Sequence, residues 1–130
     1  MFIEAKLEDL GLALPEPMRV PAGLRMPFSW VRVRGNRAYV SGHIALNADG
    51  SVAGPLGEVG AEVSAEESYE SARRVDLAHL ASLKRALGDL DRVTACCGSS
   101  PWSMRPPASI GRRWSPTATR TSSSSFTVPK

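Results

Sequence analysis

Phe28, Ser41, Gly42 and His43 are residues whose side chains or backbone could contribute to a chemical site. Ser41, Gly42 and His43 are consecutive, and Phe28 precedes Ser41 by thirteen positions. A hydroxyl and an imidazole could orient a water molecule, and an aromatic ring could form a platform for a substrate. Each residue also has a structural explanation: a strand end with a bulge, a partly buried polar residue, and sheet packing. Residue types alone favour the structural explanations.

Other reactive groups give weaker signals. Cys96 and Cys97 are the only cysteines, and no histidine or further cysteine lies near them at metal-ligand spacing, so we expect two free thiols in a reducing compartment. Gly57 and Gly60 are not followed by the Lys-Ser/Thr of a phosphate-binding loop. We therefore expect no metal and no cofactor.

Charge is distributed unevenly along the chain. Residues 1–95 carry 11 basic and 13 acidic groups, whereas residues 96–130 carry five basic and no acidic ones, so the net charge of +3 comes from the C-terminal part. Arg32, Arg34 and Arg37 alternate on a predicted hairpin, which usually means one solvated face. We do not expect nucleic acid as a partner.

Membrane and secretion signals are missing from the sequence. No run of about 18 apolar residues occurs. The first residues, Met1 to Lys6, lack the basic start and apolar block of a secretory signal. We expect a cytoplasmic protein.

Three local patterns predict the elements that would position these side chains. Residues 2–10 carry an apolar stripe that ends at Gly11, which is typical of a short helix. Residues 28–34 and 37–44 alternate around Gly35-Asn36 and predict a β-hairpin. Residues 64–88 begin with an S-x-x-E capping box and end at a glycine. The face of this long helix predicted to pack on the hairpin comprises Tyr69, Ala72, Leu80, Leu83 and Leu87.

The composition changes abruptly near residue 96. No Asp, Glu or Leu occurs from Cys96 to Lys130, and Ser122 to Ser125 form a low-complexity run. Such a segment has too few apolar residues to offset the entropy lost on ordering. The sequence therefore predicts a partial domain over residues 1–95 and an irregular, disordered tail over residues 96–130.

The hairpin sequence also carries a family resemblance. Gly35 to Ile44, Gly-Asn-Arg-Ala-Tyr-Val-Ser-Gly-His-Ile, resembles the G-N-x-x-x-V-S-G-x-x signature of the RidA/YjgF family, also called endoribonuclease L-PSP. Residues 57–64 are similar to the segment before that family's first long helix, and residues 83–93 to the end of that helix and the next strand. The N-terminal helix and its proline-rich continuation suggest the branch with an N-terminal extension.

This resemblance implies an α+β, chorismate-mutase-like fold with a mixed sheet backed by helices, here truncated. It implies a cytoplasmic homotrimer that hydrolyses enamines and imines such as 2-aminoacrylate without a cofactor, giving a 2-keto acid and ammonia. Ser41 and Gly42 match residues that line the family's cleft. His43 replaces a common glutamine, and Phe28 replaces the tyrosine of active members. The arginine that binds the substrate carboxylate belongs to the C-terminal half, and nothing in residues 96–130 matches it.

The C-terminal composition is typical of a GC-rich gene read out of frame. Moving the reading frame back by one base in residues 102–109 and in residues 117–129 permits two family-like segments in the correct order. We therefore expect a frameshift near codons 93–98 and a truncated, inactive enamine/imine deaminase. The alternative is a non-catalytic protein of the same family that binds small metabolites or interacts with other proteins.

Overall fold

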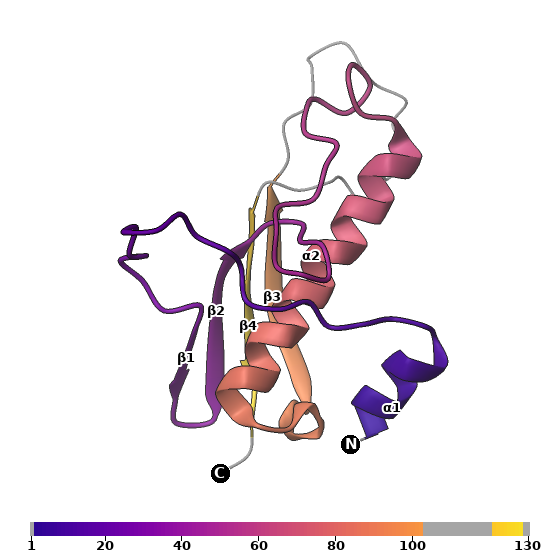
Figure 1. Ribbon diagram of the computed structural model, residues 1–130. Helices are drawn as coiled ribbons and strands as arrows, with labels where there is room; N and C mark the ends of the chain where they lie inside the picture. Colours follow the sequence, from indigo (N-terminus) through magenta and orange to yellow (C-terminus); the bar gives the residue numbers. More distant parts are fainter. Residues whose placement is uncertain (1, 103–120, 129–130) are drawn as a thin grey trace.

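The computed structural model describes residues 2–102 and 121–128 (Figure 1). These described residues form two α-helices, a short 3-10 helix and four strands. In order they are α1 (Phe2–Asp9), β1 (Val31–Arg34), β2 (Arg37–His43), α2 (Ala65–Leu87), η1 (Leu90–Arg92), β3 (Ala95–Trp102) and β4 (Thr121–Thr127).

The four strands form one sheet in the order β1-β2-β4-β3, and all three pairings are antiparallel. The predicted hairpin is confirmed, with Val31 opposite Val40 and a turn at Gly35, whose φ of 58° suits a glycine. The α+β class is confirmed, whereas the described sheet is antiparallel rather than mixed.

Strands β3 and β4 correct the prediction of an irregular tail. Residues 96–102 and 121–127 belong to the sheet, because β4 pairs with β2 on one side and with β3 on the other. Phe126 packs against the core, and Val128 is buried with its amide donating to the Asn36 carbonyl at 2.7 Å. The backbone ladder thus makes strands of segments that lack an alternating apolar pattern. Residues 103–120 and 129–130 of the predicted tail lie outside the described residues.

Helix α2 lies along one face of the sheet (Figure 1). Ser64 and Glu67 form the predicted capping box, and Gly88 ends the helix with its amide bonded to the Lys84 carbonyl. Leu83 is fully buried and Leu87 nearly so, which confirms the predicted packing of the helix on the hairpin. The core cluster that they form is completed by Ala38, Val40, Leu90 and Val128.

At the N-terminal end of α2, the side of the helix that is buried differs from the predicted apolar face. Tyr69 is 61% exposed, whereas Val75 and Ala78 are buried. Ser68, in the same turn as Tyr69, is buried, so the packed side of the first turns carries Ser68 and Val75 rather than Tyr69. None of the described helices is both long enough and apolar enough to cross a membrane.

The N-terminal segment is held at both of its ends. The first two amides of α1 donate to the Asp91 carboxylate, at 2.6 Å from Phe2 and 2.9 Å from Ile3. The connector after α1 then pairs with the turn at residues 47–50 through two backbone bonds, Glu16 to Ala48 and Arg19 to Gly50.

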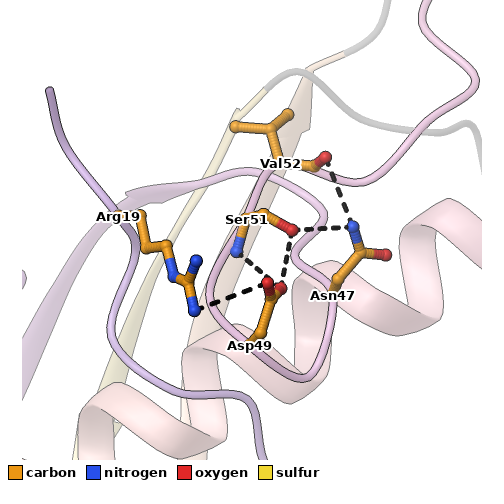
Figure 2. Close-up of polar contacts among 5 residues, drawn as sticks. All are labelled: Arg19, Asn47, Asp49, Ser51 and Val52. Carbon is orange, nitrogen blue, oxygen red and sulfur yellow. Dashed lines mark hydrogen bonds and ion pairs between the residues drawn. The ribbon is translucent and has the colours of Figure 1, made fainter.

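Figure 2 shows the side-chain contacts of that turn. Asp49 accepts from the amide and the hydroxyl of Ser51, and its carboxylate lies 3.6 Å from the Arg19 guanidinium. Asn47 donates to the Ser51 hydroxyl oxygen at 3.0 Å. These bonds give the turn a fixed shape against which the connector packs.

Candidate functional site

Three of the four predicted site residues lie at the end of β2, where the strand is irregular. The pairing of β2 with β4 shifts register between Val40 and His43, which places Ser41 and Gly42 at a bulge. Bulges commonly redirect side chains and occur beside functional sites. The structural explanation and the functional one are therefore compatible at Ser41 and Gly42.

Phe28 joins the end of β2 through an aromatic contact chain. Its ring meets Trp30 edge-on, with centroids 5.0 Å apart, and Trp30 lies 4.9 Å from the His43 ring. Phe28 is 44% exposed, while Trp30 is half-buried and His43 is buried. The chain of rings thus leads from the surface to the interior, and Phe28 presents its free area to solvent.

The Ser41 hydroxyl is engaged with the segment before β1. It donates to the Ser29 carbonyl at 2.7 Å, and the Ser41 amide donates to the Trp30 carbonyl at 2.9 Å. Both donors hold residues 29 and 30 against β2. The Ser41 oxygen keeps lone pairs that could accept a hydrogen bond from a ligand or a water molecule.

His43 is buried, with 4% of its surface exposed, and both ring nitrogens have partners. Nδ1 lies 2.7 Å from the Ser41 carbonyl and Nε2 lies 2.7 Å from the Ser82 hydroxyl. Because a carbonyl only accepts, we assign the proton to Nδ1, and Nε2 then accepts from Ser82.

The pKa of His43 is lowered, and burial is the main cause. It lowers the pKa of His43 from the ordinary value of 6.5 to about 4, since the charged ring loses its hydration. The hydrogen bond to the Ser41 carbonyl acts in the opposite direction, while the charges of His79 and Arg85 add to the lowering of the pKa. His43 is therefore neutral at pH 7.

Sequence reasoning missed three residues of α2 that surround His43. The His79 ring contacts the His43 ring at a tilt of 56° with centroids 4.5 Å apart, and the buried Ser82 bonds to His43 Nε2. Arg85 donates to the Ser82 oxygen at 3.1 Å and to the Pro15 carbonyl at 3.3 Å. These three residues could have been found in the sequence, because they are polar, follow one another at three-residue spacing and lie beside the predicted apolar face of the helix.

One group of carboxylates has metal-like spacing. Ligand atoms of Glu4, Asp89 and Asp91 lie within 4.8 Å of one another. Both Asp91 oxygens accept from amides of α1, and Asp89 accepts from the Asp91 amide at 2.9 Å. These bonds identify the group as a capping network that joins α1 to η1.

The two cysteines form no disulfide. Cys96 and Cys97 are both free and exposed, and the Cys97 sulfur lies 2.9 Å from the Thr127 hydroxyl. Neither cysteine belongs to the carboxylate group described above. They contact none of the predicted site residues through the hydrogen bonds found in the described part of the chain.

The fold is similar to solved structures. It resembles the protein Atu1372 of unknown function from Agrobacterium tumefaciens, with a TM-score of 0.75, 19% identity, and coverage of 97% of this chain and 91% of that one. It also resembles a candidate endoribonuclease from Shewanella oneidensis MR-1, with a TM-score of 0.59 and 29% identity, over 72% of this chain and 58% of that one. No family model and no curated protein matches the sequence. The first likeness shows the fold alone, and the second is a distant resemblance to an endoribonuclease of the YjgF type.

Proposed function

We propose that this chain is a RidA/YjgF-type enamine/imine deaminase by descent and that the 130-residue product does not turn over substrate. The observation that supports this most is the bulge at Ser41-Gly42, at the end of a strand in a sheet that resembles a candidate endoribonuclease. That position carries the V-S-G motif on which the family resemblance rests.

The chemistry of the site explains the proposed lack of turnover. Hydrolysis of 2-aminoacrylate needs a cation for the substrate carboxylate and groups that direct water at the C=N carbon. Phe28 has no hydroxyl, and its ring contact is with Trp30. No hydrogen bond or ion pair among the described residues brings a cation to Phe28 or Ser41. His43 is neutral and buried, so it offers neither charge nor an accessible proton.

The test is a deaminase assay against 2-aminoacrylate on this chain and on a chain with the reading frame restored. We expect hydrolysis at the spontaneous rate for this chain and faster hydrolysis for the restored one. Losing a charge-assisted contact to the substrate carboxylate costs about 2–5 kcal/mol, or tens- to thousandfold in rate. Turnover by this chain that disappears in Ser41→Ala or Gly42→Val would overturn the proposal.

A second candidate is binding of a small metabolite without turnover. It is favoured by the exposed ring of Phe28 beside the bulge, where a planar ligand could pack while the Ser41 oxygen accepts a hydrogen bond. Titration with a 2-keto acid, followed by amide NMR shifts at Ser41 and Gly42, tests it. Phe28→Ala should abolish those shifts, and identical shifts in wild type and variant would exclude this site.

The resemblance also implies a homotrimer for the intact family, and we propose that this chain fails to complete it. Arg32 and Tyr39 form an exposed cross-strand pair on the face of the sheet opposite buried Ala38 and Val40. Strands β1 and β3 form the edges of the described sheet, and an unpaired strand edge favours non-specific association. Sedimentation velocity showing a monodisperse, high-melting trimer would contradict the proposal.

We propose that the reading frame changes near codons 93–98. The nucleotide sequence across codons 90–100 tests this directly. One lost base, or two gained, relative to the sequence of a close homologue supports the proposal. If this nucleotide sequence shows no inserted or deleted base relative to the homologue, the proposal is overturned.

A further inference from the structure

A continuous line of hydrogen bonds runs from the N-terminal connector to the bulge of β2. The Arg85 guanidinium donates to the Pro15 carbonyl at 3.3 Å and to the Ser82 oxygen at 3.1 Å. Ser82 lies 2.7 Å from His43 Nε2, and His43 Nδ1 lies 2.7 Å from the Ser41 carbonyl. The line joins segments that are far apart in the sequence.

The direction of every bond in this line follows from its two ends. A guanidinium can only donate, and a carbonyl can only accept. Arg85 therefore occupies a lone pair of the Ser82 oxygen, and the Ser82 proton is left for His43 Nε2. His43 must then carry its own proton on Nδ1, facing the Ser41 carbonyl.

We propose that Ser82 and Arg85 are positioning residues that hold His43 in its neutral, Nδ1-protonated form and thereby fix the Ser41 carbonyl at the bulge. This proposal extends the ligand site proposed above, since Ser41 and Gly42 form its wall. The preferred tautomer of His43 follows from the hydrogen bonds alone and does not depend on any activity.

The surroundings of His43 contain few other charges. Helix α2 contributes Arg85 and the buried His79, and the exposed Asp76 lies 4.0 Å from His79. The contact from the segment before β1 is the uncharged ring of Trp30. Arg85 therefore disfavours a charged His43 by repulsion as well as through Ser82.

The test is nitrogen NMR of the histidine rings in 15N-labelled full chain, titrated with acid. We expect wild type to carry the proton on Nδ1 of His43 at pH 7. Ser82→Ala removes the donor to Nε2 and should raise the midpoint of His43 titration by about 0.5–1 pH unit, while Ser82→Thr keeps the hydroxyl and the midpoint. Arg85→Gln should also raise the midpoint.

Arg73→Gln is the matched control, because it removes the same charge from α2 at an exposed position that pairs with Glu70 at 3.6 Å. A wild-type proton on Nε2, or equal midpoints in Arg85→Gln and Arg73→Gln, would overturn the proposal. Equal shifts in Ser82→Ala and Ser82→Thr would show that packing, not the hydroxyl, acts on His43. The titration with a 2-keto acid tests the ligand site separately. If the amides of Ser41 and Gly42 in wild type do not shift, the proposed ligand site is refuted, but the result for the His43 tautomer still stands.

Discussion

Replacing His43 by glutamine should remove a large part of the acid sensitivity of this fold. In the folded protein burial lowers the pKa of His43 from 6.5 to about 4. Between these two values the unfolded chain binds a proton on this ring and the folded chain does not. The contribution of His43 to the free energy of unfolding therefore falls as the pH drops from about 6.5 to about 4, and this contribution changes no further below that range.

The size of the effect follows from the two pKa values. Their difference corresponds to about 3 kcal/mol when the pH lies below both, and to about 2.5 kcal/mol at pH 4.5. His43 is 4% exposed, so solvent screens this penalty little. A loss of this size is a large fraction of the total stability of a domain, which is typically about 5–15 kcal/mol.

The assay is urea unfolding of wild type and His43→Gln at pH 7 and pH 4.5. The carboxylates titrate in both proteins, so the difference between the two pH dependences isolates His43. We expect wild type to lose about 2.5 kcal/mol more than the variant over this range. The same loss in both proteins would refute the reasoning, whatever the absolute stability of the variant.

Three further predictions concern packing and the N-terminal segment. Leu83→Ala should lower the free energy of unfolding in urea by about 2–5 kcal/mol, because Leu83 is fully buried. Tyr69→Ala should lower it by less than about 0.5 kcal/mol, because Tyr69 is exposed, and equal losses would contradict the described packing of α2. Gly50→Ala should release the connector, because φ is +80° and an added Cβ would meet the Pro17 carbonyl oxygen; unchanged hydrogen exchange at the connector amides would argue against this. Asp91→Ala removes the acceptor of the first amides of α1. It should lower the free energy of unfolding by about 1–2 kcal/mol and reduce the helical circular dichroism, and unchanged stability and circular dichroism would show that the cap is unimportant.

Local signals in the sequence were sufficient for the first hairpin and the long helix. The turn at Gly35-Asn36 and the capping box of Ser64 and Glu67 act within a few residues, so the backbone conformation that they impose does not depend on distant parts of the chain. The glycine that ends α2 acts in the same way. The predicted helix over residues 2–10 and its termination at Gly11 are also confirmed, but the first amides of this helix bond to the distant carboxylate of Asp91.

The strands β3 and β4 were not predictable in this way. The serine-rich Thr121–Thr127 segment has no apolar alternation, and its place in the sheet comes from backbone bonds to β2 and β3. The exposure of Tyr69 likewise depends on which side of α2 packs against the rest of the fold, and helical spacing placed that side incorrectly at the first turns.

The sequence by itself determined the strand that carries Ser41, Gly42 and His43, whereas Phe28, predicted at the start of a strand over residues 28–34, lies before β1. Only the tertiary structure decided that His43 is buried and neutral, because its partner Ser82 lies 39 residues away on α2. Periodicity shows which face of a helix is apolar, but the pairing of one polar atom with another depends on how helix and strand pack. Burial then disfavours the charged ring, and this is why the chemistry available to His43 is a property of the fold rather than of its residue type.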